Sequence, residues 1–427
     1  MIDLKLLREH PDLFRKDLTK RKDQEKLSWI DEVLAKDKDA RALQHEVEQL
    51  RASRNKIAEE INTLKKSGKD ITQKKKEAAE IPVQIKKKET ALFELTEKIN
   101  FYLMRLPNLM HESVPYGKDD TENVEVRKWG TIPKITFPII NHGEVAENLG
   151  IVDFKKASEV SGAGFYYLLG DLGLLNMALC QFAIEHMVQK GFTLVIPPLM
   201  LRRKPYEGVT DLSDFENVMY KIENDDLYLI ATSEHPLAAL MMNKVIKEED
   251  LPLRFVGFSP CFRREIGSHG VDTKGLFRVH QFWKVEQFVY CKPEDSALWH
   301  EKLTTNSEEM YQALKIPYRI VNICTGDLGI VASKKFDLEL WMPRQEAYKE
   351  ACSCSNCTDF QARRLNIRYE TKTGERKYVH TLNNTAIATS RAMVALLENN
   401  QQKDGSIVVP QVLQKYMMGK KVIGQKS

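Results

Sequence analysis

Two heptad series near the N-terminus constrain the fold of this chain more than any other feature. In the first series, apolar residues recur in steps of three and four from Leu43 to Leu64. In the second, the same spacing runs from Ala78 to Leu106, and "KKSGKD" lies between the two. Heptads joined by a glycine-containing turn predict an antiparallel coiled coil. Each arm, of about 26 residues, would be roughly 40 Å long at 1.5 Å per residue.

Such a rod buries only a narrow seam, so the main core must lie elsewhere in the chain. Pro82 falls inside the second series, where a proline removes a helix hydrogen bond and clashes with the preceding turn, so we expect a kink or a local break there. A polar linker with prolines and a glycine follows the hairpin. We therefore expect an N-terminal domain at 1–115, with its hairpin at about 40–106, and a second domain at 116–427.

The positive charge of the chain is concentrated near the turn of this hairpin. Residues 65–88 hold nine lysines and three acidic residues, an excess of six, whereas the whole chain carries a net charge of +4. Such a cluster favours contact with a polyanion, such as the phosphate backbone of a nucleic acid. The alternative is that the heptads dimerise and the lysines keep the tip in solution. The candidate phosphate contacts are Lys65, Lys66, Lys69, Lys74, Lys75 and Lys76.

Composition argues against several classes of protein. No apolar run approaches the roughly 18 residues of a membrane-spanning helix, and the N-terminus lacks the apolar core of a signal peptide. The seven cysteines are odd in number and scattered, which favours a reducing compartment over a disulfide framework. We therefore expect a cytoplasmic protein with no membrane partner. Neither G-x-G-x-x-G nor G-x-x-x-x-G-K-[ST] occurs, so a nucleotide site here would be neither Rossmann-like nor a P-loop.

Beyond the linker, strand-like segments alternate with scattered helices, and "NNTAIATSRAMVALLEN" (383–399) reads as an alanine-rich helix. The stretch "CFRREIGSHGVDTKGLFRVHQFWKVEQF" (261–288) reads as strand, polar loop and strand. Because side chains alternate faces along a strand, Arg278, Phe282 and Glu286 should share one face, as should Arg263 and Glu265. Arginine suits phosphate oxygens, phenylalanine suits a base and glutamate suits an ammonium group. The alternative is an exposed hairpin with cross-strand ion pairs.

Three segments resemble the motifs of class II aminoacyl-tRNA synthetases. "FRREIGSHGVDTKGLFRVHQF" resembles motif 2, "NNTAIATSRAMVALLENN" resembles motif 3, and "GFTLVIPPLM" resembles motif 1, with its proline at Pro198. "TSE" at 232–234, "SCSNCTDFQARR" at 353–364 and the coiled coil are similar to the seryl-tRNA synthetase family. This resemblance covers essentially the whole chain. It implies an α+β fold, in which helices flank an antiparallel sheet and a coiled-coil arm precedes it, and a homodimer formed through motif 1.

The resemblance also implies an activity. A serine–tRNA ligase activates L-serine with ATP and Mg²⁺ to form seryl-adenylate, then transfers serine to the 3′ end of tRNA(Ser), which the arm and the acceptor end would contact. Whether selenocysteine tRNA is a second substrate stays open. Adenylate formation is an in-line attack of a carboxylate on the α-phosphorus. It needs positioning and charge neutralisation more than a side-chain base.

For ATP, the resemblance implies a role for each residue of motifs 2 and 3. Arg263 would bind the α-phosphate and the serine carboxylate, with Arg278 and Arg391 as the other catalytic cations. Phe282 would stack on adenine, and Glu265 would accept a hydrogen bond from the adenine amino group. The implied ATP-binding residues are Arg263, Arg264, Glu265, Arg278, Val279, Phe282, Glu350, Ala351, Cys352, Ser353 and Arg391.

For serine, the resemblance implies a small polar pocket. Thr232 and Glu286 would hold the ammonium group. Glu286, Asn383 and Thr385 would surround the hydroxyl group. The implied magnesium ligands, whose oxygen atoms suit this ion, are Glu350 and Ser353. The implied serine-binding residues are Thr232, Ser233, Glu234, Arg263, Glu286, Asn383 and Thr385.

Several features stay open beside this interpretation. Cys352, Cys354 and Cys357 form C-x-C-x-x-C, as in some zinc sites. Only three thiols are local and alternate strand residues face opposite ways, so we expect no zinc. His280 and Lys284 share the strand face of the motif 2 residues, and no role follows for either. Two other functions remain: a coiled-coil nucleic-acid binder that has lost catalysis, and a ligase that loads an amino acid onto a carrier protein.

Overall fold

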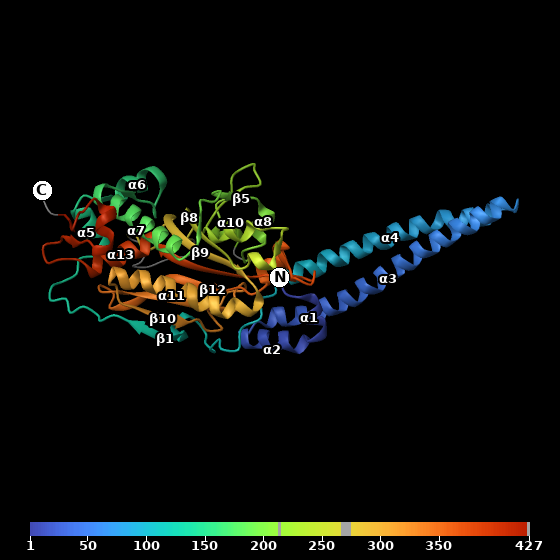
Figure 1. The fold of residues 1–427 in the computed structure, drawn as a ribbon, viewed down its shortest axis with the longest axis horizontal. Coiled ribbons are helices and arrows are strands. Elements are labelled where there is room, and N and C mark those ends of the chain that lie inside the picture. The colour runs from blue at the N-terminus through green and yellow to red at the C-terminus, as the bar shows by residue number, and fades with distance from the viewer. Residues whose placement is uncertain (212–214, 266–274, 425–427) are drawn as a thin grey trace. The chain divides into compact units, whose positions relative to one another are not determined.

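The chain divides into two compact units. The computed structural model describes residues 1–211, 215–265 and 275–424, and the units are Met1–Leu106 and Pro107–Ser427. The position near residue 115 at which the linker predicts a boundary lies inside the second unit. Figure 1 shows both units as ribbons coloured by residue number. No helix of the described ranges is both long and apolar enough to cross a membrane.

The first unit is entirely helical. Asp3 and Asp23 cap the first and third helices, because their carboxylates accept hydrogen bonds from backbone N–H groups of the first turn. Val47 packs against Ile81 and Ile85 in the seam of the hairpin, as the heptads predict. The four helices are α1 (Leu4–Glu9), α2 (Pro11–Arg21), α3 (Gln24–Lys66) and α4 (Thr72–Leu103).

The local break predicted at Pro82 does not occur, since α4 is a single helix that contains this proline. A proline inside a helix frees the carbonyl of the residue four positions earlier, here Ala78. Pro82 lies on the exposed side of α4, so water can satisfy that carbonyl. Its neighbour Ile81 is buried in the seam with Ile85, and this burial favours an unbroken helix.

A large antiparallel sheet forms the centre of the second unit. Its strand order is β1-β10-β11-β12-β15-β9-β8-β4, and all neighbours are antiparallel except β4 and β8. The strands are β1 (Val124–Trp129), β4 (Thr193–Val195), β8 (Leu253–Phe262), β9 (Gln281–Cys291), β10 (Tyr318–Asn322), β11 (Lys334–Met342), β12 (Ala347–Asn356) and β15 (His380–Ala388).

Helices flank this sheet and give it two cores, which confirms the predicted α+β class. Val285 and Val289 of β9 belong to the larger core, which includes residues of α7 (Gly170–Gln189), α11 (Ser296–Leu314) and α13 (Thr389–Asn399) (Figure 1). On the other face, Phe288 and Tyr290 belong to a smaller core. The other helices are α5 (His142–Asn148), α6 (Phe154–Ser161), α8 (Arg203–Glu207), α9 (Phe215–Val218), α10 (Glu234–Ala239), α12 (Phe360–Leu365) and α14 (Gln411–Gln414).

Short strands form small sheets around this centre. Pro197 and Pro198 of the motif 1 segment lie between β4 and β5 and outside both strands. The short strands are β2 (Val152–Asp153), β3 (Tyr167–Leu168), β5 (Met200–Leu201), β6 (Tyr228–Leu229), β7 (Val245–Lys247), β13 (Arg368–Glu370), β14 (Arg376–Tyr378), β16 (Ile407–Val408) and β17 (Val422–Ile423).

The expectation that residues 383–399 are one helix is wrong in its first third. Residues 383–388 belong to β15, and α13 begins only at Thr389. The β-branched Thr385 and Ile387 favour a strand, and pairing with β9 on one side and β12 on the other outweighs the helix propensity of the alanines. This strand presents Asn383 and Thr385 side by side on one face, which a helix would not do.

Candidate active site

The charged stretch and motif 3 surround a cavity of about 230 Å³ in the second unit. The polar groups come from the ends of β8 and β9, from β12 and β15, and from the start of α13. The implied residues that line the cavity are Thr232, Glu234, Arg263, Glu265, Arg278, Val279, Phe282, Glu286, Glu350, Ala351, Ser353, Asn383, Thr385 and Arg391.

Three implied residues do not line this cavity. Ser233 is fully buried, and its hydroxyl group forms a hydrogen bond of 2.7 Å with that of Ser259. Cys352 points into the core, where its thiol contacts the Tyr311 hydroxyl group at 3.6 Å. The backbone N–H of Arg264 donates to the carbonyl of Val218. Residues 266–274, which form most of the expected motif 2 loop, lie outside the described residues.

Strand parity predicts only part of the motif 2 face. Phe282 and Glu286 do share a face of β9, but Arg278 precedes the strand and reaches the cavity from a bend. Arg263 and Glu265 likewise follow the end of β8, and Glu265 has a left-handed φ of 45°. The parity argument is therefore wrong for these three residues, although all of them line the cavity.

Arg263 is held by backbone groups on two sides. Its Nε donates to the carbonyl of Ala231 at 3.3 Å, and its backbone N–H donates to the carbonyl of His280 at 2.9 Å. The guanidinium carbon lies 5.3 Å from the centroid of the Phe282 ring. His280 itself stacks on Phe165, with ring centroids 5.2 Å apart. The structure thus gives His280 a packing role beneath the end of the motif 2 segment.

One carboxylate that lines the cavity, that of Glu286, has a donor on each of three sides. Glu286 is 1% exposed, and it accepts hydrogen bonds of 3.2 Å from the Asn383 amide and the Thr385 hydroxyl group. Its other contact is an ion pair of 2.6 Å with the ammonium group of Lys284. Four side chains on β9 and β15 therefore form one polar cluster, which can bind a small molecule that carries an ammonium group and a hydroxyl group.

Glu234 lies near this cluster and holds a proton more tightly than an ordinary carboxylate. Burial raises the pKa of Glu234 to about 7, and the negative charge of Glu286 adds to this effect. The Gln361 amide donates to Glu234 at 3.1 Å. The backbone N–H of Glu234 donates to the hydroxyl oxygen of Thr232 at 3.1 Å, which orients that hydroxyl group at the cavity wall.

A β-bulge brings Glu350 and Ser353 to the same side of the sheet. They are three residues apart, so on a regular strand they would face opposite ways. The pairing of β11 with β12 shifts between Cys352 and Glu350, which leaves Ala351 without a partner. Both Glu350 and Ser353 consequently line the cavity.

Arg391 from α13 binds to Glu350. Its Nη1 donates to the Glu350 carbonyl at 2.7 Å and lies 3.3 Å from a carboxylate oxygen. Burial by itself would raise the pKa of Glu350, but the positive charges of Arg391 and Lys335 outweigh it and lower the pKa to about 2. Glu350 is therefore ionised at neutral pH, and its side chain is 44% exposed.

The residues present fit the magnesium ion that the family implies. Glu350 and Ser353 supply a carboxylate and a hydroxyl oxygen, the hard ligands that magnesium prefers. The described residues contain no group of three or more His, Cys, Asp or Glu that could hold a metal ion. Two protein ligands are enough for magnesium, which usually keeps several waters and binds substrate phosphates.

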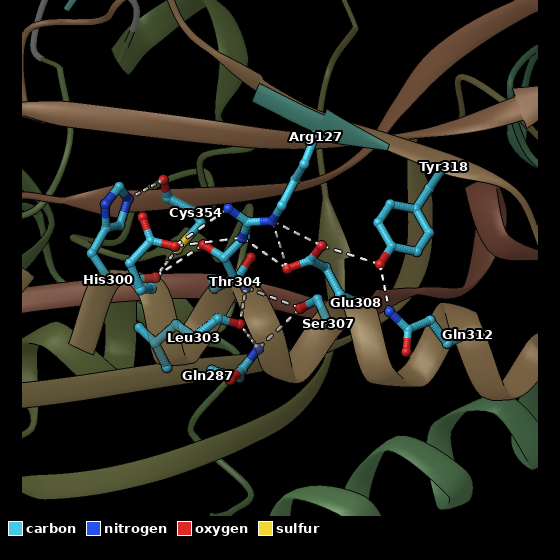
Figure 2. A network of polar contacts seen from close by, with 12 residues as sticks. Arg127, Gln287, His300, Leu303, Thr304, Ser307, Glu308, Gln312, Tyr318 and Cys354 are labelled. Carbon is cyan, nitrogen blue, oxygen red and sulfur yellow. Dashed lines mark hydrogen bonds and ion pairs between the residues drawn. The ribbon is translucent and has the colours of Figure 1, made fainter. Parts of the chain in front are cut away.

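A polar network on the other face of the sheet holds these strands in place (Figure 2). The Gln287 amide donates to Ser307 of α11 at 3.1 Å, and Ser307 donates to the carbonyl of Thr385 at 2.9 Å. The Asn384 amide also donates to Ser307, at 2.9 Å. Because Gln287 follows Glu286 on β9, this network helps to hold β9 and β15 in the register that pairs Glu286 with Thr385.

Five residues that line the cavity were missed by the sequence argument. The alternation of side chains along the strand could have identified Lys284, because it lies between Phe282 and Glu286 on the same face. The others are small or apolar residues next to motif residues, and neither charge nor spacing distinguishes them. The five are Phe277, Lys284, Ser355, Ala388 and Ser390.

Comparison with known proteins agrees with this geometry. Residues 1–110 match the family model for the seryl-tRNA synthetase N-terminal domain, and residues 217–400 match that for the class II tRNA synthetase core domain (G, H, P, S and T). The chain is 59% identical to a serine–tRNA ligase of Methanocella arvoryzae over 98% of this chain and 99% of that protein. It is 57% identical to a serine–tRNA ligase of Methanospirillum hungatei over 99% of this chain and 100% of that protein.

Solved structures extend this likeness to the fold. The crystal structure of the seryl-tRNA synthetase of Pyrococcus horikoshii complexed with ATP matches with a TM-score of 0.95 and 50% identity over 100% of both chains. The cytoplasmic serine–tRNA ligase of Naegleria fowleri in complex with AMP matches with a TM-score of 0.88 and 36% identity, over 100% of this chain and 99% of that one. The chain therefore belongs to the seryl-tRNA synthetase family of class II aminoacyl-tRNA synthetases.

Proposed function

We propose that the residues of the cavity carry out the two steps of the serine–tRNA ligase reaction. In the first step, a serine carboxylate oxygen bonds to the α-phosphorus of ATP, the bond from that phosphorus to the β-phosphate oxygen breaks, and pyrophosphate leaves with the electron pair. In the second, the terminal ribose hydroxyl group of the tRNA attacks the carbonyl carbon, AMP leaves and the hydroxyl proton is released. The observation that carries this proposal is one cavity lined by both the Arg263–Phe282 pair and the Glu286 cluster.

We assign the part of the cavity around Phe282 and Arg391 to ATP. Phe282 and Arg391 would contact adenine, and Glu265 would accept a hydrogen bond from its amino group, with backbone near Val279 beside the nucleotide. Arg278 would contact the phosphates, since it lines the cavity, where it lies 3.7 Å from a Glu265 carboxylate oxygen. Arg264, Ala351 and Cys352 would contribute through their backbone, because the side chains of Arg264 and Cys352 do not line the cavity. ATP bound to the relative from Pyrococcus horikoshii supports this assignment.

We assign the part of the cavity around Glu286 to serine. Thr232 and Glu286 would bind the ammonium group, and Arg263 the carboxylate. Asn383 and Thr385 would lie beside the hydroxyl group, since both already donate to Glu286. A pocket that hydrogen-bonds this hydroxyl group rejects alanine, because alanine leaves buried polar groups unpaired. Glu234 would line the pocket, whereas Ser233, which does not line the cavity, would act indirectly.

Glu350 and Ser353 would hold the magnesium ion. When bound, this ion neutralises negative charge on the phosphates of ATP. The chain's own contribution is the bulge at Ala351, which keeps the two oxygen ligands on one side of the sheet. Arg391 keeps Glu350 oriented through its contact with the Glu350 carbonyl.

We assign tRNA binding to the helical hairpin of the first unit. Five of the six candidate lysines are exposed: Lys65, Lys66, Lys69, Lys75 and Lys76. Lys74 differs, because its ammonium group lies 3.0 Å from Glu60 and 2.9 Å from Glu77. An exposed group of lysines suits the phosphate backbone of tRNA(Ser), and the acceptor end of that tRNA would enter the cavity.

We also propose a homodimer formed through the motif 1 segment. Met177 of α7 is 53% exposed and Ile196, beside the two prolines, is 75% exposed. Exposed apolar side chains on neighbouring elements are typical of an interface between subunits. We place the protein in the cytoplasm, since its seven cysteines are all buried and free.

The experiment that tests the function is amino-acid-dependent ATP–pyrophosphate exchange, measured with each of the twenty amino acids. We expect exchange with serine and at least hundredfold less with alanine, which lacks the hydroxyl group. Folded protein that shows no exchange with any amino acid would instead support a nucleic-acid binder without catalysis. Exchange with serine but no transfer to tRNA would support a ligase for a carrier protein.

A further inference from the structure

Lys284 is a buried cation in the middle of the cavity that the reaction described above does not use. It lies on β9 and is 5% exposed, and it lines the cavity with Phe282 and Glu286. Its ammonium group lies 2.6 Å from Glu286 Oε2. A lysine is seldom buried this deeply unless its charge is paired, so its position in a ligand cavity calls for an explanation.

The register of the sheet shows where Lys284 would meet a ligand. Alternate residues of a strand are about 6.7 Å apart on one face, so Phe282, Lys284 and Glu286 form three successive positions along β9. If adenine lies at Phe282 and the serine ammonium group at Glu286, the ribose and the α-phosphate must lie between them. Lys284 occupies that middle position.

Its neighbours across the sheet are too short to reach the ligand. Lys284 pairs with Ser259 on β8 and with Ala388 on β15. The Ser259 hydroxyl group is already hydrogen-bonded to Ser233, and alanine has no polar group. Of these three paired residues, Lys284 is therefore the one whose side chain is positively charged and long enough to contact the ligand.

We propose that Lys284 is a further catalytic residue, which neutralises Glu286 before serine binds and contacts the α-phosphate during adenylate formation. This inference rests on the proposed function. The arriving serine ammonium group provides Glu286 with a new cation, which releases the lysine to turn along β9 toward the phosphate. There its charge reduces the repulsion between the serine carboxylate and the α-phosphate as the new oxygen–phosphorus bond forms and the bond to pyrophosphate breaks.

Charge counting within the cavity supports this exchange of partners. Before serine binds, Lys284 pairs with the carboxylate of Glu286, and Arg263 lines the same cavity. Serine adds one ammonium group and one carboxylate, so the balance within the cluster does not change. What changes is the position of the charges: the substrate ammonium group and Lys284 both lie near Glu286, and their repulsion favours movement of Lys284 toward the phosphate.

The test compares K284Q and K284M, which remove the charge, with K284R, which keeps it. The matched control is K377Q, since Lys377 is a lysine of the same unit whose side chain is 47% exposed and pairs with Glu375. Two kinds of measurement are made: kcat and KM in serine-dependent ATP–pyrophosphate exchange, and the affinities for AMP and for adenosine by calorimetry, each at saturating serine so that Lys284 is released from Glu286. Thermal unfolding identifies which of the two uncharged variants is folded.

We expect an uncharged variant to lower kcat about a hundredfold, as removal of one transition-state donor does. We expect the ratio of AMP to adenosine affinity to fall about tenfold, because the α-phosphate loses a charged hydrogen bond. K284R should keep at least a tenth of the wild-type kcat, and K377Q should match wild type. A merely structural lysine would change KM for serine and leave the AMP to adenosine ratio unchanged.

A folded K284Q or K284M with kcat and the AMP to adenosine ratio within threefold of wild type would overturn the role of Lys284. The same conclusion follows if folded K284R loses as much activity as the uncharged variants. These outcomes are distinct from failure of the proposed function, because in that case the wild-type protein itself would show no serine-dependent exchange.

Discussion

The lysines near the tip of the helical hairpin and the charged residues of the cavity differ in their exposure to solvent. Lys65, Lys66 and Lys69 are exposed, whereas Lys284 and Glu286 are 5% and 1% exposed. Exposed charges are screened by salt and act mainly through their number. Buried charges act through their position, because water does not screen them. Loss of one residue should therefore matter little on the arm and greatly in the cavity.

The largest expected effect separates the two units. We predict that deletion of residues 41–105, which removes most of α3 and α4, abolishes charging of tRNA(Ser) and leaves serine-dependent exchange intact. The reason is that the cavity is lined entirely by residues of the second unit, among those the structure describes. Exchange and charging are measured on the same preparation. Charging that survives the deletion would contradict the role assigned to the arm.

The next effect tests a single position in the cavity, the half-buried Arg263. We predict that R263A lowers the kcat of exchange by at least about a hundredfold, the usual loss for one charge-stabilising donor. The matched control is R376A, since Arg376 is an arginine of the same unit whose side chain is 58% exposed and pairs with Glu370. A near-normal rate for R263A would remove Arg263 from the site.

Removal of exposed charges should have a smaller and additive effect. We predict that K65A/K66A/K69A raises KM for tRNA several-fold and lowers the slope of log affinity against log salt by roughly two to three. K74A should change affinity less than K75A, because Lys74 is already paired with Glu60 and Glu77. If K74A and K75A weakened tRNA binding equally, the ion pairs with Glu60 and Glu77 would not reduce the contribution of Lys74 to binding. A salt slope that does not change would argue against phosphate contacts altogether.

The last prediction concerns pH and stability, and not the rate or the affinity. The folded-state pKa of Glu234 is raised from 4.5 to about 7 by burial, so the folded protein binds this proton more tightly than the unfolded chain. The stabilising contribution is complete below pH 4.5 and is lost as the pH rises toward 7. We predict that the stability of E234Q relative to wild type increases between pH 5 and pH 8. Urea unfolding at several pH values measures the free energy of unfolding of both proteins. A difference between E234Q and wild type that does not change with pH would refute the prediction.

Some of the cavity could be predicted because its residues lie close together in the sequence. Phe282 and Glu286 are four residues apart on β9, so strand parity places both on one face. The heptads of α3 and α4 are equally local, and the seam around Val47, Ile81 and Ile85 follows from their spacing. In each case the period of a regular element determines which side chains lie together.

Other parts of the cavity could not be predicted in this way. Glu350 and Ser353 line the cavity together only because Ala351 bulges from β12, and the bulge arises from pairing with β11. Asn383 and Thr385 face Glu286 because residues 383–388 pair with β9 and β12 as a strand. The alanines in this segment would by themselves favour a helix. These outcomes depend on segments distant in the sequence.

The sequence by itself determined the helical hairpin, its lysine-rich tip and the residue types needed to bind a nucleotide and an amino acid, because these follow from local spacing and from motifs. Only the tertiary structure decided that α4 continues through Pro82, that Lys284 pairs with Glu286, and that strands from four parts of the chain share one cavity. The physical reason is that burial and strand pairing depend on long-range neighbours, and their free energy exceeds local preferences for helix, strand or break.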